Sequence, residues 1–365
     1  MSSMSQRGLT HLGMDVHKDS ISVGILAPED DVPEVEKIFH DEASVRRLIG
    51  RFDDPRSLVA CYEAGPTGYE LHRLLTGMGL RCQVIAPSLI PRSASDRVKT
   101  DKRDCRKLAR LHRAGQLTAI RVPTRPEEAV RDLCRARADI VEDLERAHKR
   151  LGAFLLRHGE VWRGGSAWTL KHEAWLSARR FDDTAMTATF AHYRATVDSR
   201  VRQLAAIDAD LAACYNSDPF AEPVRRLCAY RGVAHLGALS LASEVCDWRR
   251  FGRASAFMGF TGLIPSEYSS GSKTSRGRIT RAGNSHMRKQ LIESAWAYQR
   301  GPATGVALRK RQEGAPAETV ARAWDAQVRL CGRFRRLGAR KNSKNVVATA
   351  VARELCGFLW AEMTA

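Results

Sequence analysis

The sequence predicts an α/β domain at the N-terminus, a long helical connector that resembles a coiled coil, and a mostly helical C-terminal part. Three observations predict this order. Short apolar runs alternate with helical patterns up to residue 115, two long amphipathic stretches follow, and helical spacing dominates the last third of the chain. The expected regions are residues 1–115, 116–222 and 223–365.

The first region alternates strands and helices. Ile21, Val23 and Ile25 alternate with small or polar residues, which is the pattern of a half-buried strand. A strand that ends at Asp15 precedes it, and a turn at residues 17–19 joins the two. The further elements expected are strands at 35–40, 57–62 and 81–86 and helices at 43–52, from Gly68 through Leu75, and at 101–114.

The middle region is helical. Residues 116–126 are polar with two prolines, which predicts a linker. Apolar residues then recur at helical spacing over 127–156 and again over 184–214, with a segment containing Trp162, Trp168 and Trp175 between the two stretches. This pattern indicates an antiparallel helix pair or arm whose apolar stripe is a core or a dimer seam.

The charge of the chain favours a polyanionic partner. Lys and Arg number 59 against 41 Asp and Glu, so the net charge is +18. Nucleic acid is the commonest polyanion that such a protein meets, and a merely basic surface is the alternative. No apolar run approaches the roughly 18–20 residues of a membrane helix, and residues 1–8 lack the apolar core of a secretory signal. We therefore expect a cytoplasmic protein with no membrane partner.

The cysteines predict neither disulfides nor zinc. Nine are scattered along the chain, and none has CxxC spacing. We expect most of them to be reduced and buried.

Four acidic residues lie where chemistry is expected. Asp15 and Glu63 each end a predicted strand, where open α/β sheets place their ligands, and Asp101 and Asp104 share one face at the start of a helix. Four carboxylates without a His or Cys partner are hard ligands that select Mg²⁺ or Mn²⁺, and a pair of such ions clamps the oxygens of a phosphodiester. Each acid also has a structural alternative as a turn cap, a solvated strand end or a first-turn helix acid.

The C-terminal region has its strongest pattern at residues 257–291. Gly, Ser and Thr dominate Ser269–Gly277, which predicts an exposed loop. Basic residues follow with no acidic residue among them, as expected of a surface that binds a phosphate backbone. A solvated loop is the alternative. The candidate nucleic-acid ligands are Lys273, Arg276, Arg278, Arg281, Arg288 and Lys289.

Two weaker patterns flank this stretch. Residues 224–244 predict two short helices around a glycine-containing turn, which is either a phosphate-binding helix–hairpin–helix or an ordinary helical hairpin. Basic residues at 329–344 either contact a nucleic-acid backbone or form a solvated helix face.

Three acidic motifs resemble those of a known family. The stretches GMDVHK (13–18), YEAGPTG (62–68) and KTDKRD (99–104) are similar to the signature of the DEDD transposases of insertion sequences, the IS110 and IS1111 group. The resemblance implies an N-terminal domain with a RuvC-like, ribonuclease-H-type fold. It also implies that the acids of these motifs, Asp15, Glu63, Asp101 and Asp104, bind Mg²⁺, with Mn²⁺ as an alternative ion.

The C-terminal stretch is similar to the transposase domain of the same family, in which a serine of a Tyr-x-Ser-Gly-Ser loop is the nucleophile. Alignment on Tyr268 places that serine at Ser270, with Ser269 and Ser272 as neighbouring alternatives. The resemblance further implies a composite site in a homodimer or tetramer, and a bridge RNA that pairs with donor and target DNA.

These features predict a DNA recombinase of an insertion sequence that cuts one strand by attack of a serine and passes it to a new partner. Two other functions remain open. One is a RuvC-like nuclease that uses the acids and water, and the other is a non-catalytic nucleic-acid-binding protein.

Overall fold

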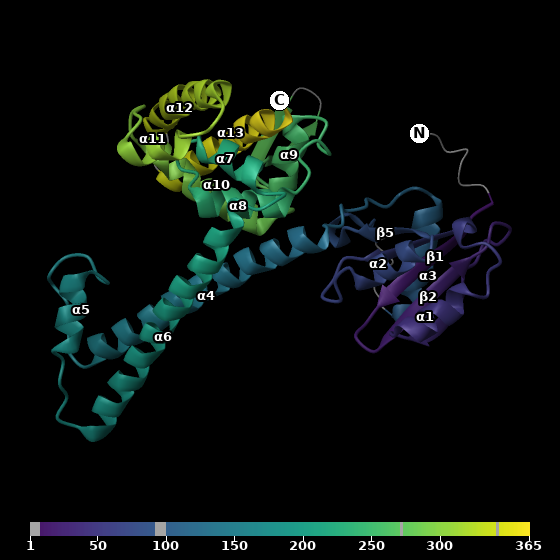
Figure 1. Cartoon of the computed structure of the whole chain (residues 1–365), viewed down its shortest axis with the longest axis horizontal. Coiled ribbons are helices and arrows are strands. Elements are labelled where there is room, and N and C mark those ends of the chain that lie inside the picture. The colour runs from purple at the N-terminus through teal and green to yellow at the C-terminus, as the bar shows by residue number, and fades with distance from the viewer. Residues whose placement is uncertain (1–7, 92–99, 271–272, 341–342) are drawn as a thin grey trace. The chain divides into compact units, whose positions relative to one another are not determined.

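The structure is a computed structural model that describes residues 8–91, 100–270, 273–340 and 343–365, with the backbone alone at residues 273 and 274. The chain divides into two compact units, Met1–Val122 and Pro123–Ala365 (Figure 1).

The N-terminal unit is built on a five-stranded mixed sheet of order β3-β2-β1-β4-β5. Strand β2 is antiparallel to its neighbours β1 and β3, whereas β4 and β5 run parallel to β1. The predicted alternation of strands and helices is confirmed. Its elements are β1 Thr10–Val16, β2 Ser20–Leu26, β3 Glu34–Phe39, α1 Glu42–Ile49, β4 Leu58–Glu63, α2 Glu70–Gly77, β5 Arg81–Ile85 and α3 Asp101–Arg113.

Helix α3 lies directly on the backbone of the sheet. Gly13 of β1 and Gly24 of β2 are paired across the strands. A Cβ atom at Gly13 would lie 2.3 Å from the backbone nitrogen of Ala109, and one at Gly24 would lie 2.7 Å from the carbonyl oxygen of Cys105. Backbone atoms of α3 occupy this space. The helix can approach the strands this closely only because the residues beneath it are glycines.

A buried histidine pair also joins α3 to the sheet. Nδ1 of His11 in β1 and Nδ1 of His112 in α3 are 3.2 Å apart, so one ring donates a hydrogen bond to the other. Burial lowers the pKa of both imidazoles to about 4. Both rings are therefore neutral near pH 7, so either of them can accept this hydrogen bond through Nδ1.

The segment after α3 returns to the sheet. The backbone nitrogen of Ile120 donates to the carbonyl of Val84 at 2.8 Å, and Ile85 forms an isolated bridge with Ala119. The first residues of the expected linker thus pack on the N-terminal unit.

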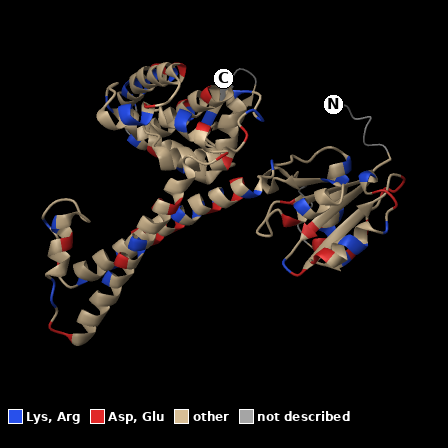
Figure 2. Ribbon diagram, in the orientation of Figure 1, with Lys and Arg blue, Asp and Glu red and all other residues tan. Residues whose placement is uncertain are grey.

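Two long helices open the second unit, α4 (Arg125–Arg157) and α6 (Thr184–Cys214), with α5 (Leu170–Ser177) between them. Arg137 near the start of α4 pairs with Asp208 near the end of α6, and Arg200 pairs with Asp143 at 3.6 Å. The helices are therefore antiparallel, as predicted (Figure 1). Acidic and basic residues both lie along α4 (Figure 2), and apolar residues form a separate small core.

The rest of the second unit is mostly helical, as predicted. Its helices are α7 Ala221–Cys228, α8 His235–Val245, α9 Ala254–Thr261, α10 Ser285–Ala295, α11 Val306–Gln312, α12 Ala317–Gly338 and α13 Lys344–Thr364. Helix α13 packs against α9, α10 and α12. All nine cysteines are free thiols, six of them buried. Within the described ranges, no helix is long and apolar enough to cross a membrane.

We predict that Gly13→Ala loosens α3. The added methyl group would overlap backbone atoms of the helix, and an overpacked position of this kind costs about 3 kcal/mol. Amide hydrogen exchange should therefore speed up about 100-fold in residues 101–113. Gly77→Ala is the control, because nothing lies within 4 Å of a Cβ there. Unchanged exchange in α3 of the Gly13 variant would contradict this account of the packing.

Candidate active site

Two acids lie side by side at one edge of the sheet. The last paired residues of the parallel strands β1 and β4 are Met14 and Tyr62, so Asp15 and Glu63 are the next residues on neighbouring strands. Both lie at the carboxyl ends of these strands, as predicted. The side chain of Asp15 is 21% exposed, and Glu63 is exposed.

The first turn of α3 supplies two more acids. Thr100 caps the helix, and its hydroxyl accepts a hydrogen bond from the backbone nitrogen of Arg103. Asp101 and Asp104 follow in this first turn, where the positive end of the helix dipole favours carboxylates. Since α3 rests on Gly13 and Gly24, its N-terminus lies at the edge of the sheet where β1 ends.

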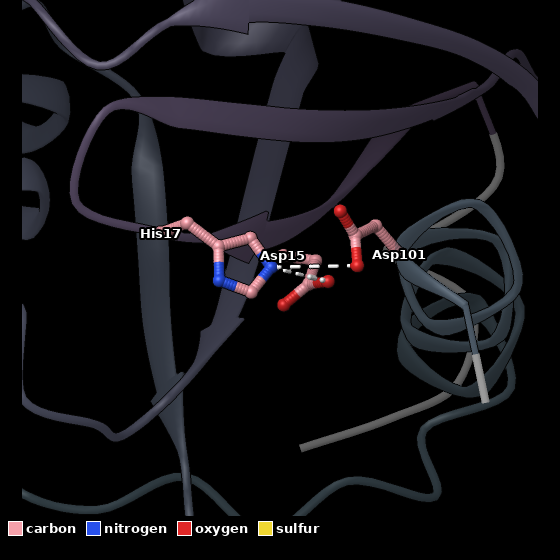
Figure 3. Close-up of side chains that lie close together, drawn as sticks. All are labelled: Asp15, His17 and Asp101. Atoms are coloured by element: carbon pink, nitrogen blue, oxygen red, sulfur yellow. Dashed lines mark hydrogen bonds and ion pairs between the residues drawn. The ribbon is translucent and has the colours of Figure 1, made fainter.

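Histidine 17 joins Asp15 to Asp101 (Figure 3). Its Nε2 lies 3.3 Å from Oδ2 of Asp15 and 3.5 Å from Oδ1 of Asp101. Ligand atoms of these three residues all lie within 4.8 Å of one another. The sequence-based expectation of carboxylates without a His partner was therefore wrong. A residue two positions after Asp15 along an extended chain points to the same side, and this spacing could have revealed the histidine.

The structure gathers the four predicted acids unevenly. Asp15 and Asp101 belong to the compact group with His17. Partial burial raises the pKa of Asp15; the charges of Asp101 and Asp104 also raise it, whereas that of His17 lowers it. Asp104 thus acts on Asp15 electrostatically, and Glu63 lies on the adjacent strand outside the compact group. This donor set, mainly carboxylate oxygen, suits a hard divalent cation.

The serine motif forms a hairpin rather than the loop that its composition predicts. Strands β6 (Pro265–Ser270) and β7 (Lys273–Ile279) are antiparallel, and Ser270 pairs with Lys273. A segment rich in Ser and Thr shows no alternation of apolar and polar residues. Backbone hydrogen bonds hold an exposed two-stranded ribbon together without that alternation. Gly271 and Ser272 lie outside the described residues, as does the side chain of Lys273.

The two described serines of the motif have different environments. The hydroxyl of Ser269 donates to Oε1 of Glu267 at 2.9 Å, and Arg276 donates to the other oxygen of this carboxylate at 3.2 Å. Ser270 is exposed, and its hydroxyl has no hydrogen-bond partner among the described residues. Ser270 is thus the more available of the two to a ligand.

The candidate basic residues also differ. Arg278, Arg281 and Lys289 are exposed, and Arg276 is exposed beside Glu267. In contrast, Arg288 is partly buried and donates from Nη1 to the carbonyl oxygen of Thr261 at 3.0 Å. Arg288 therefore stabilises the end of α9.

A buried carboxylate anchors the segment that follows the hairpin. Glu244 of α8 accepts two hydrogen bonds from Arg135 of α4, at 2.8 and 2.9 Å, and one from the side-chain amide of Asn284 at 2.7 Å. Asn284 caps α10, and its backbone nitrogen donates to the carbonyl of Phe260. Burial raises the pKa of Glu244, but the hydrogen bonds and charge of Arg135 outweigh it, so the net pKa is lowered.

Comparisons with known proteins agree with these motifs. Residues 12–159 match a family model described as a transposase and named for the DEDD acids of IS110, and residues 224–305 match the transposase family IS116/IS110/IS902. The chain is also 40% identical over 353 residues to the putative transposase y4qE of Sinorhizobium fredii, an alignment that covers 96% of this chain and 87% of that protein. The chain belongs to the IS110 family of transposases.

Two further relatives carry the same description. The transposase of insertion sequence element IS1533 from Leptospira borgpetersenii is 34% identical, with 91% of this chain and 97% of the relative covered. The transposase of IS1328 from Yersinia enterocolitica is 23% identical, with 98% and 97% covered. This transposase is therefore an enzyme that acts on DNA. Because the matched N-terminal family is defined by acids, the match points away from the separate class of serine recombinases.

We predict that Glu244→Gln destabilises the second unit by about 2–3 kcal/mol, because it leaves the Arg135 guanidinium without its carboxylate. The stabilisation by Glu244 is complete above the ordinary glutamate pKa of 4.5 and is lost as the pH falls below it, because the pKa is lowered in the folded state. Urea unfolding at pH 7 and at pH 4 measures the free energy of unfolding of wild type and variant. The difference between the two proteins should be smaller at pH 4. Glu293→Gln, at an exposed position of α10, is the control, and an equally small effect of both variants would rule out the anchoring role.

Proposed function

We propose that this transposase cleaves and rejoins DNA strands with the help of a divalent cation held by Asp15, Glu63, Asp101 and Asp104. The observation that carries the proposal is the approach of Asp101, from the first turn of α3, to Asp15 at the end of β1. The strand order β3-β2-β1-β4-β5, with β4 and β5 parallel to β1, supports a RuvC-like, ribonuclease-H-type fold for this unit.

Mg²⁺ is the ion proposed for the reaction, with Mn²⁺ as the alternative. When bound, such an ion neutralises charge that develops on the phosphoryl oxygens. The carboxylates of Asp15 and Asp101 would hold it, and Glu63 and Asp104 border the same place. The raised pKa of Asp15, which partial burial and the charges of Asp101 and Asp104 cause, supports this assignment.

Ser270 is the proposed nucleophile. Its Oγ forms a bond to phosphorus while the bond from phosphorus to a deoxyribose oxygen breaks. The serine hydroxyl loses its proton, and the released deoxyribose oxygen takes one up, so the number of phosphoester bonds is unchanged. The exposure of Ser270 supports this role for it. Ser269 is the weaker candidate, because its hydroxyl donates a hydrogen bond to Glu267.

The proposed partners are donor and target DNA, and a bridge RNA that supplies sequence specificity by base pairing. A net charge of +18 supports binding of such polyanions. Arg276, Arg278, Arg281 and Lys289 are the exposed candidates for backbone contacts, Lys273 is a further one, and Arg288 would act by holding the adjacent backbone.

The remaining parts of the proposal concern assembly. Residues 1–115 would form the acidic domain, 116–222 the connector and 223–365 the serine domain, in a cytoplasmic homodimer or tetramer. Exposed apolar side chains on the connector, including Leu156 and Val201, support self-association.

Hydrolysis by water is the second candidate function. The acidic group lies wholly within the N-terminal unit, whereas Ser270 belongs to the other unit. A RuvC-like nuclease would need only the acids, and it would leave no covalent adduct.

We predict that Asp15→Asn abolishes DNA cleavage. Loss of one charged ligand should lower the cleavage rate by roughly 100-fold or more, while the fold survives because Asn occupies the same volume. The rate is measured on end-labelled donor DNA with Mg²⁺ and element RNA. Asp19→Asn, at an exposed position four residues away, should cleave normally. Cleavage by the Asp15 variant at the wild-type rate would exclude the metal assignment.

We predict that Ser270→Ala abolishes a covalent protein–DNA adduct. Denaturing gels of reactions with labelled DNA should show labelled polypeptide for wild type and for Ser269→Ala and Ser272→Ala, but none for Ser270→Ala. Metal-dependent nicking without any adduct in the wild type would instead establish hydrolysis by water.

A further inference from the structure

His17 is the one described residue in the compact acidic group that the four-acid assignment leaves without a role. Its Nε2 faces both carboxylates, at 3.3 Å from Asp15 and 3.5 Å from Asp101 (Figure 3). Two ligands of one ion with bonds of about 2.1 Å lie about 3.0–3.5 Å apart, in octahedral or tetrahedral arrangement. The separations between the nitrogen and the two oxygens, which a hydrogen bond and ion pairs set here, also match those within one coordination sphere.

The backbone around His17 is held in place. The turn between β1 and β2 is closed by a hydrogen bond from the backbone nitrogen of His17 to the carbonyl of Ser20, at 2.9 Å. His40, after β3, donates from Nδ1 to the carbonyl oxygen of His17 at 2.6 Å, and its own backbone nitrogen donates to the carbonyl of Asp19. The imidazole thus extends from a turn fixed on both sides, and a fixed backbone lowers the entropy lost on binding a ligand.

We propose that His17 is a nitrogen ligand of the divalent cation at Asp15 and Asp101. Imidazole is a better ligand for first-row transition ions than for Mg²⁺, which prefers oxygen. A site with His17 therefore binds Mn²⁺ more tightly, relative to Mg²⁺, than a site of carboxylates alone. This inference rests on the proposed metal site, and it adds a residue that determines which ion the site prefers.

The test is direct binding of metal to the full chain, without DNA. Isothermal titration with Mn²⁺ and with Mg²⁺ is carried out on wild type, His17→Asn and Asp15→Asn. The control is His192→Asn, which changes an exposed histidine of α6. Circular dichroism without metal checks that each variant is folded.

We expect His17→Asn to weaken Mn²⁺ binding about tenfold or more and to change Mg²⁺ binding much less. His192→Asn should bind both ions as wild type does. Loss of Mn²⁺ binding in Asp15→Asn with unchanged binding in His17→Asn would overturn the role of His17 and leave the acidic site intact. Tighter Mn²⁺ binding by His17→Asn would also overturn it, since the imidazole would then compete with the ion.

Unchanged binding of both ions in Asp15→Asn would instead contradict the proposed function itself. A second readout separates coordination from a general loss of stability. Co²⁺ bound to wild type should show the visible absorption of a site with a nitrogen ligand, and the band should shift in His17→Asn. The same spectrum in both proteins would exclude His17 as a ligand.

Discussion

The direct contact between the α3 backbone and the glycine pair Gly13–Gly24 is the constraint on which the acidic group depends. Atoms of α3 fill the space that a Cβ would occupy at either glycine. Because the helix lies this close, Asp101 in its first turn reaches Asp15 at the end of β1. The parallel register of β1 and β4 adds Glu63 at the same edge. Packing at the two glycines therefore determines how far Asp101 lies from Asp15.

The electrostatics of this edge oppose ionisation of Asp15. Burial of Asp15 and the charges of Asp101 and Asp104 raise its pKa, so ionisation of the group has a free-energy cost in the folded protein. His17 offsets part of that cost. In the second unit a paired carboxylate stabilises the fold instead, because Glu244 receives hydrogen bonds from Arg135 and Asn284. The two carboxylate sites thus differ in the direction of their pKa shifts, which is upward for Asp15 and downward for Glu244.

The sequence predicted the strand and helix order, the helix pair and the positions of the acids, because periodicity and strand ends are local features. It did not predict the place of His17, which depends on α3 bringing Asp101 to the turn after β1. It also missed the hairpin around Ser270, since an exposed ribbon of Ser, Thr and Gly lacks apolar alternation. The roles of Arg276 and Arg288 could not be separated either, because only the folded chain shows that Arg288 holds the carbonyl of Thr261.

The proposed cation site combines residues of β1, the turn that follows it and α3. Anomalous diffraction from crystals of the transposase grown with Mn²⁺ tests it most directly, because the signal locates the ion independently of activity. A peak within coordination distance of Asp15 and Asp101 is the expected result. A well-ordered structure at saturating Mn²⁺ with no peak beside Asp15 would contradict it.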